Sequence, residues 1–130
     1  MDDLSKAHTY EHRRFSRVEV KCPATITLES GETVAAEIHD VSMCGVRFTP
    51  VNGISIGGPC TMQFINDDGQ NIEIAAVIVR SVGSSIAAEI TGIKNACYGN
   101  FRKLLVDNTS EPASIDTELI ARDEIVPESY

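Results

Sequence analysis

The chain has 130 residues and a net charge of −8, with 42% hydrophobic and only 5% aromatic residues. This length fits one small domain with tails, and no apolar run in the sequence reaches the length of a membrane-spanning helix. Residues 107–130 hold seven acids and one base, which leaves residues 1–106 with a net charge of only −2. Because nucleic-acid-binding surfaces are basic and carry stacking aromatic side chains, this balance argues against a nucleic-acid partner.

Residues 1–10 are polar and lack a periodic apolar pattern, which predicts a flexible N-terminal arm. The sequence opens with acids and has no apolar stretch behind them, unlike a secretory signal, so we expect a cytoplasmic protein. The four cysteines and three histidines are scattered and form no CxxC pair. We therefore expect reduced structural cysteines, no metal site and no cofactor.

β-Forming residues recur in six short segments that are separated by turn signals such as Asn66-Asp67-Asp68-Gly69. In the first segment Pro23 interrupts the alternation of apolar residues. The six expected strands cover residues 18–28, 33–42, 45–49, 60–65, 71–82 and 85–90. Strands at this spacing predict an antiparallel sandwich or barrel, and closure of the sheet would remove its exposed edges.

The pattern changes after Gly92, where apolar residues recur at helical spacing and predict a helix over residues 95–106. The fold class is therefore all-β, a six-stranded antiparallel sandwich or, with its edges closed, a barrel, followed by a C-terminal helix. Residues 107–130 form an acidic C-terminal tail. Within it, residues 115–125 have the pattern of a second helix, with Ile115, Leu119 and Ile120 in its apolar stripe.

The first candidate binding feature is a cluster of three arginines, Arg13, Arg14 and Arg17, directly before the first strand. A guanidinium presents a planar fork of donors that fits a phosphate or a guanine edge, and it also stacks on aromatic faces. Two such forks at the mouth of a barrel could hold an anionic, planar ligand. The alternative is that these arginines belong to a solvated basic arm.

The second feature is the turn Asp40-Val41-Ser42-Met43-Cys44-Gly45, where the second expected strand meets the third. Alternation along the second strand places Asp40 on the face of Ile38, and two-residue spacing points Asp40 and Ser42 the same way. Asp40 could accept hydrogen bonds from the ring NH and amino group of a guanine. Gly45 could adopt a positive φ and admit a ligand close to the backbone. The alternative is an ordinary Asx or Ser turn between strands.

Together the two features resemble the PilZ domain family, which is marked by RxxxR before the first strand and by [D/N]xSxxG on the next strand pair. Here these stand as Arg13-Arg14-Phe15-Ser16-Arg17 and Asp40-Val41-Ser42-Met43-Cys44-Gly45. The resemblance covers residues 11–106, a PilZ-like domain, and implies a receptor for cyclic di-GMP. It implies that Arg13 and Arg17 hold phosphate and guanine with help from Arg14, and that Asp40, Ser42 and Gly45 form the opposing wall.

The sequence also departs from the family pattern. His12 stands where many relatives carry another arginine, a position that influences whether one ligand or a stacked pair binds, and Cys44 replaces a common glycine. Arg47 and Arg80 lie on expected strands nearby and could contribute to the site, but ordinary surface charges are the preferred interpretation. The neighbours His39 and Asp40 suggest an acid–base pair, but adjacent residues of a strand face opposite sides, so the pair is set aside.

The leading hypothesis is a non-catalytic receptor or adaptor whose N-terminal arginine segment becomes ordered on the ligand and is read by an effector protein. The family resemblance allows effectors of motility, chemotaxis or polysaccharide synthesis. The alternative is a PilZ-like interaction module that no longer depends on the nucleotide. The sequence shows no nucleophile elbow, P-loop or dinucleotide-binding fingerprint, so an enzyme is the least supported class.

Overall fold

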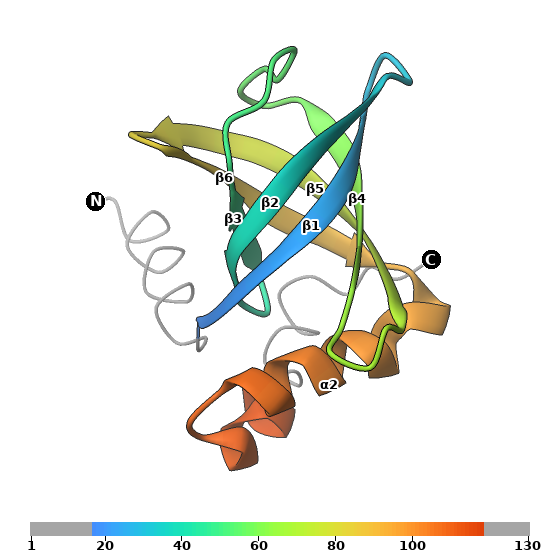
Figure 1. The fold of residues 1–130 in the computed structure, drawn as a ribbon, viewed down its shortest axis with the longest axis vertical. Helices are drawn as coiled ribbons and strands as arrows, with labels where there is room; N and C mark the ends of the chain where they lie inside the picture. The colour runs from blue at the N-terminus through green and yellow to red at the C-terminus, as the bar shows by residue number, and fades with distance from the viewer. Residues whose placement is uncertain (1–16, 119–130) are drawn as a thin grey trace, which may run out of the picture.

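Six antiparallel strands close into a barrel with the spatial order β1-β2-β3-β6-β5-β4, and β4 pairs back onto β1 (Figure 1). The computed structural model describes residues 17–118, apart from the side chain of residue 82. The strands are β1 (Val18–Leu28), β2 (Thr33–Val41), β3 (Gly45–Phe48), β4 (Pro59–Ile65), β5 (Asn71–Val82) and β6 (Ser85–Ile93). The prediction of a six-stranded antiparallel barrel is confirmed.

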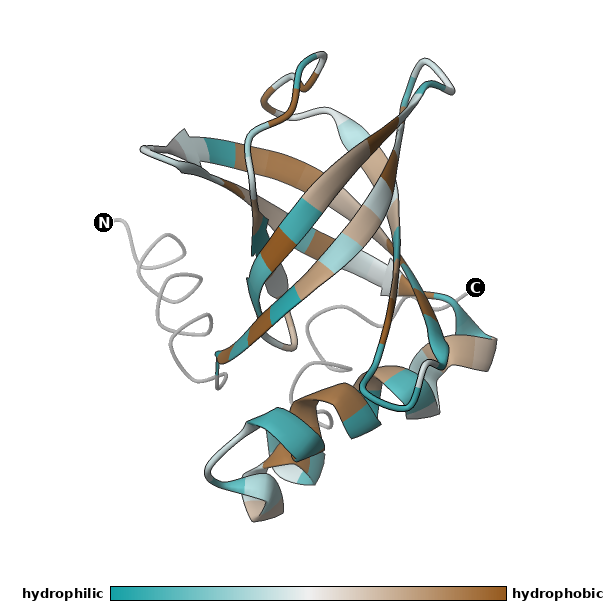
Figure 2. Ribbon diagram, viewed as in Figure 1, coloured by the Kyte–Doolittle hydropathy of each residue, from teal (hydrophilic) through white to brown (hydrophobic). Residues whose placement is uncertain are grey.

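Alternation of apolar and polar residues places the hydrophobic core inside the barrel. Ile26 on β1, Ile38 on β2, Ile74 on β5 and Ile90 on β6 are all fully buried. The hydropathy colouring changes from residue to residue along these strands, as expected when one face is buried and the other meets water (Figure 2). Burial of each such side chain stabilises the fold by about 1.5–3 kcal/mol relative to exposure.

Pro23 does not interrupt β1, which runs through it as one strand. The ladder between β1 and β4 begins only at Thr25, so Pro23 is paired on the β2 side alone. A proline cannot donate to a ladder and is tolerated where one edge of its strand has no partner. The strand therefore continues through Pro23, because no partner on the β4 side needs an N–H group at this residue.

A bulge changes the faces of β2 near its end. The β2–β3 register shifts between Ile38 and Asp40, so that one extra residue, His39, is inserted into β2. Ile38 and Val41 are both fully buried in the core, whereas the carboxylate of Asp40 meets the exposed side chain of Arg47 on the outer face. The prediction that Asp40 shares the face of Ile38 is therefore wrong.

Helix α2 (Tyr98–Asn108) follows a short 3-10 helix, η1 (Asn95–Cys97), which confirms the predicted C-terminal helix. It lies across one end of the barrel and contacts β1 and β5 (Figure 1). Phe101, Leu104 and Leu105 are fully buried and join the barrel core. The spacing of these three residues puts them on one face of the helix.

The chain beyond α2 turns back and remains packed on the domain through η2 (Pro112–Ser114) and a helical turn at residues 115–118. Ile115 is fully buried in the same core. Nε and Nη2 of Arg102 donate to the two carboxylate oxygens of Asp116 at 2.7 and 3.0 Å. Packing thus extends past residue 106.

The remainder of the expected second helix, including Leu119 and Ile120, lies outside the described residues. In the part of the chain that is described, no helix is both long enough and apolar enough to cross a membrane. All four cysteines fall within this part, and none forms a disulfide.

Candidate functional site

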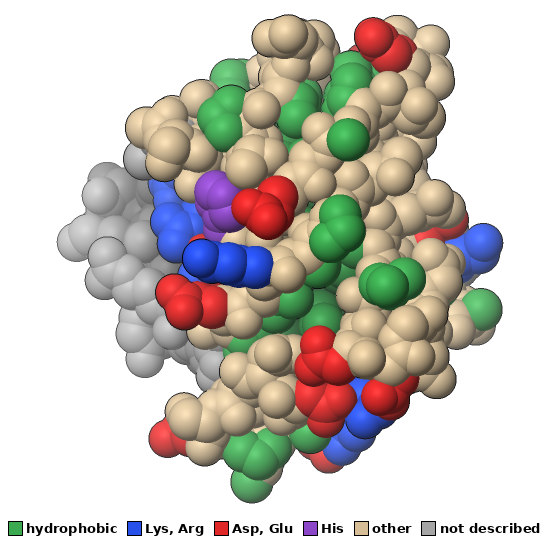
Figure 3. Space-filling view, in the orientation of Figure 1, with side chains coloured by type: hydrophobic (Ala, Val, Ile, Leu, Met, Phe, Trp, Pro, Cys, Tyr) green, Lys and Arg blue, Asp and Glu red, His purple; other side chains and the backbone are tan. Residues whose placement is uncertain are grey.

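The residues of the second motif gather where β2 ends, the chain turns, and β3 begins. Arg17, which directly precedes β1, lies over the same turn: its Nη2 would be 3.7 Å from a Cβ added at Gly45. The last arginine of the first motif therefore meets the second motif in space. Figure 3 shows basic, acidic and histidine side chains next to one another over this region of the barrel. Arg13 and Arg14, and also His12, lie outside the described residues.

The carboxylate of Asp40 is the centre of this cluster. Its Oδ1 accepts a hydrogen bond from Nη1 of Arg17. Its Oδ2 accepts from Nε of Arg47 at 2.9 Å and lies 2.7 Å from Nη2 of the same guanidinium. The Asp40 side chain is only 7% exposed, whereas the two arginine side chains are 43% and 46% exposed. A buried acceptor thus holds two cationic forks at the surface.

This arrangement keeps Asp40 ionised. Burial acts to raise the pKa of Asp40, but hydrogen bonds from Arg47 and Arg17, together with their charges, outweigh it and hold the pKa below its ordinary value. The same carboxylate raises the pKa of Arg47, chiefly through the hydrogen bond. The cluster therefore presents a carboxylate and two guanidinium groups, all charged, at neutral pH.

Ser42 stabilises the turn itself. Its Oγ accepts hydrogen bonds from the backbone N–H groups of Cys44 and Gly45, at 3.3 and 3.1 Å, and its own N–H donates to the carbonyl of Gly45 at 2.8 Å. Ser42 is buried. These contacts are those of the Ser turn that the sequence left open as the alternative. The hydroxyl oxygen also lies 3.8 Å from the position that a Cβ on Gly45 would take, beside the guanidinium of Arg17.

Gly45 does not have a positive φ, so the expectation of a left-handed backbone at this glycine is wrong. Its requirement is one of space. An added Cβ would lie 3.3 Å from the carbonyl oxygen of Ala88 on β6, which is tighter than most Cβ contacts, and close to Arg17. The absence of a side chain lets β3 and β6 approach and lets Arg17 cover the turn.

Arg47 was missed as a site residue, because the sequence favoured an ordinary surface charge. It pairs directly with Asp40 in the β2–β3 register, and the bulge turns both side chains outward. The signal was present in the spacing: with a turn at residues 42–44, a residue of the next strand must lie opposite Asp40. Alternation alone assigned Asp40 to the wrong face and so hid the pair.

The same bulge corrects the reasoning on His39. Nδ1 of His39 shares a 3.2 Å hydrogen bond with Oγ of Ser85, whose strand neighbour Ile86 is buried in the core. His39 and Asp40 therefore both face outward, contrary to simple alternation. Their partners differ, since Asp40 is held by arginines and His39 by a serine. The geometry thus forms no hydrogen-bonded acid–base pair between them.

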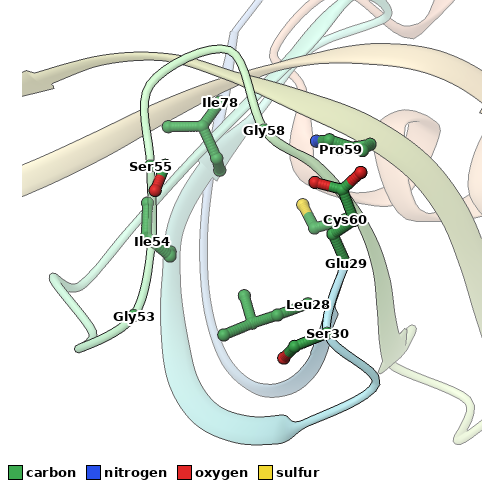
Figure 4. A pocket seen from close by; sticks show the side chains of 10 residues that line it. All are labelled: Leu28, Glu29, Ser30, Gly53, Ile54, Ser55, Gly58, Pro59, Cys60 and Ile78. Atoms are coloured by element: carbon green, nitrogen blue, oxygen red, sulfur yellow. The ribbon is translucent and has the colours of Figure 1, made fainter.

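A separate hollow lies between the β1–β2 turn and the loop before β4 (Figure 4), at the opposite end of the barrel from α2 (Figure 1). It has a volume of about 210 Å³ and is lined by Leu28, Ile54 and Ile78, with Glu29 and Cys60 beside them. Burial raises the pKa of Cys60 to about 11, so its thiol stays protonated. With a carboxylate as its charged group, this hollow is unsuited to an anionic ligand, and no motif residue lines it.

Comparison with known proteins decides the family. A family model described as the PilZ domain matches residues 11–99, which is well over half of the chain. The chain belongs to the PilZ domain family. This match includes both motifs that carried the resemblance in the sequence. No curated protein matches the chain.

Solved structures share the fold, and two of them are described as PilZ domains. The Bacillus subtilis inhibitor of motility (MotI/DgrA) matches with a TM-score of 0.59 and 19% identity over 72% of this chain; this chain spans only 47% of that one. The PilZ domain of CeSA from a cellulose-synthesizing bacterium matches with a TM-score of 0.55 and 20% identity, covering 68% of this chain and 94% of that one. The PilZ domain with c-di-GMP of YcgR from Escherichia coli has a TM-score of 0.51 and 14% identity, covering 87% and 96%.

Metal ligation finds no support in the described PilZ domain. Among residues 17–118 there is no group of three or more His, Cys, Asp or Glu side chains placed to hold a metal ion. The polar groups that do gather, at Asp40, are arranged as ion pairs. The chemistry available there is recognition of a ligand that carries both anionic groups and hydrogen-bond donors.

Proposed function

We propose that this PilZ domain is a non-catalytic cytoplasmic receptor for cyclic di-GMP. The observation that carries the proposal is the contact between the two motifs, in which Arg17 of RxxxR donates to Asp40 of DxSxxG. Two segments that lie 23 residues apart in sequence meet at one end of the barrel. Among the structural relatives, the YcgR domain is described with the same ligand.

The chemistry of the site fits a cyclic dinucleotide that contains guanine. Guanidinium forks bind phosphate oxygens and guanine edges in pairs, which suits Arg17 together with Arg13 and Arg14. An ionised carboxylate such as Asp40 accepts from the ring NH and the amino group of guanine. A bidentate pair of this kind discriminates between bases by about 1–3 kcal/mol.

Relay of the signal would use the N-terminal arginine segment. Arg17 precedes the first strand directly, so a ligand that draws Arg13 and Arg14 toward the turn also orders the residues between them and the barrel. An effector protein then recognises the ordered segment. The inhibitor of motility among the structural relatives makes a motility component a reasonable first candidate, alongside components of chemotaxis and polysaccharide synthesis.

Isothermal titration calorimetry with cyclic di-GMP tests the proposal and counts the bound ligands. We expect saturable binding at micromolar protein, no binding by Asp40→Ala or Arg13→Ala, and unchanged binding by Arg102→Ala. Arg102 is a matched control because it lies on α2, away from the turn, and forms a bidentate pair with the carboxylate of Asp116. Absence of heat from folded wild-type protein would refute the receptor role and favour the nucleotide-independent interaction module.

A further inference from the structure

The two arginines that hold Asp40 are not equivalent. Arg47 lies within β3, whose backbone at this point pairs with Asp40 on β2 and with Ala87 on β6. Arg17 lies outside the strands, directly before β1. Arg47 directs two nitrogens at Oδ2, whereas Arg17 uses Nη1 on Oδ1. One carboxylate oxygen is therefore held from the rigid barrel, and the other from the end of the arginine segment.

This asymmetry matters because both oxygens of Asp40 are already occupied. A guanine that donates to Asp40 must take the place of one guanidinium or share an oxygen with it. Arg17 can leave Oδ1 when its segment moves toward the ligand. The backbone of Arg47 is fixed in two ladders, so its contact with Oδ2 can be kept while the partner on Oδ1 changes.

We propose that Arg47 is a positioning residue for the cyclic di-GMP site. Arg47 holds Oδ2 of Asp40 in place, so that Oδ1 can exchange its hydrogen bond from Arg17 for hydrogen bonds from a guanine. The inference rests on the proposed receptor function and adds to it a residue that belongs to neither motif. Arg47 acts through Asp40. It orients the carboxylate, keeps it ionised and offsets the loss of the Arg17 contact when that arginine turns to the ligand.

The surface ion pair between Arg102 and Asp116 differs from the Arg47–Asp40 pair in the exposure of its carboxylate. Arg102 and Asp116 also form a bidentate pair, but the Asp116 side chain is 67% exposed and water can replace either partner. The Asp40 side chain is 7% exposed, so its carboxylate depends on protein partners. The arginines of the two pairs are almost equally exposed, at 46% and 44%. Arg47 and Arg102 therefore differ chiefly in the burial of the carboxylate that each of them contacts.

Other ionisable groups surround Asp40 and are common to every variant considered. Glu19 on β1 pairs with Asp40 in the register, and His39 precedes it in the bulge. Glu89 on β6 stands opposite Gly45, at the far side of the turn. Because these groups are present in wild type, in the Arg47 variants and in the control, a difference between the pH profiles follows from the change at residue 47.

The test measures the Kd of cyclic di-GMP from about pH 8 to about pH 4.5 for wild type, Arg47→Ala, Arg47→Lys and the control Arg102→Ala. At neutral pH we expect Arg47→Ala to weaken binding about tenfold, the size of one lost charge-assisted hydrogen bond. Its affinity should also begin to fall at a higher pH than that of wild type, because the buried carboxylate loses the partner that lowers its pKa. Lysine should restore the pH profile and part of the affinity, since it keeps the charge but not the fork.

The outcomes separate this inference from the receptor function. If wild type binds and Arg47→Ala matches Arg102→Ala in both Kd and pH profile, the positioning role is overturned and the receptor stands. If Arg47→Ala weakens binding but keeps the wild-type pH profile, Arg47 does not act through Asp40, and the inference fails in that way. If folded wild type does not bind at all, both proposals fall.

Discussion

Replacement of Asp40 by Asn probes the centre of the site without changing its shape. The carboxylate accepts charge-assisted hydrogen bonds from two guanidinium groups, each of which would contribute about 1.5–3 kcal/mol if it were fully buried. The arginine side chains are 43% and 46% exposed, so water screens both pairs and the contribution of each falls to at most about 1 kcal/mol. Together they predict that Asp40→Asn lowers the free energy of unfolding by about 1–2 kcal/mol at neutral pH.

The sign of the pH dependence follows from the lowered pKa of Asp40. A carboxyl group whose pKa is lower in the folded state stabilises the fold fully above its unfolded pKa, about 3.9, and this stabilisation disappears as the pH falls through the lower folded value. The difference in unfolding free energy between wild type and Asp40→Asn should therefore be constant near neutral pH and shrink below about pH 4.

Urea denaturation followed by circular dichroism, at neutral pH and at steps down to about pH 3, measures this difference directly. Comparison of the two proteins at each pH cancels the titration of the other carboxyl groups. A difference that stays the same at every pH, or that is absent at neutral pH, would refute the argument that Asp40 is an ionised carboxylate held by two arginines.

Three further substitutions test the turn and the C-terminal packing. Gly45→Ala should weaken cyclic di-GMP binding at least about tenfold in calorimetry, because its Cβ would lie 3.3 Å from a β6 carbonyl oxygen. The control Gly99→Ala, on the open surface of α2, should bind normally and gain about 0.5 kcal/mol in denaturation. Equal affinities of the two variants would contradict the steric reason. Ser42→Ala should cost about 1–3 kcal/mol by urea denaturation, since two backbone N–H groups lose their acceptor, and a neutral result would show that water replaces the hydroxyl. Ile115→Ala should cost about 2–5 kcal/mol while the exposed Thr117→Ala leaves the Tm nearly unchanged, as scanning calorimetry would show; a stable Ile115 variant would mean that residues 107–118 do not support the core.

Local patterns in the sequence were sufficient for the secondary structure. The alternation of apolar residues, the hairpin signal at residues 66–69 and the helical spacing after Gly92 predicted six strands and a helix at nearly their observed bounds. Pairing between distant strands was not readable in this way. The ladders of β3 with β6 and of β1 with β4 depend on which edges remain after the hairpins form, and closure of the barrel satisfies both.

The candidate site divides along the same line. The residue types and spacing of the two motifs indicated Arg17, Asp40, Ser42 and Gly45, and the structure brings these four together at one turn. Arg47 belongs to neither motif; the spacing of the turn places a residue of the next strand opposite Asp40, but the face that the two share depends on the bulge in the folded sheet. Nor could the motifs show that Gly45 is needed because a side chain there would crowd β6.

Composition, alternation and motif spacing thus determined what this protein is made of: a small barrel, a helix at its end, and an arginine pair with a carboxylate turn. Only the tertiary structure decided how the carboxylate is held. One inserted residue in β2 turns Asp40 from the core to the outer face of the sheet, where it stays buried under arginines, and β3 then supplies Arg47 to its second oxygen. The physical reason is that a bulge and a register are set by pairing between strands, and the free energy of that pairing depends on the whole barrel, which no local stretch of sequence contains.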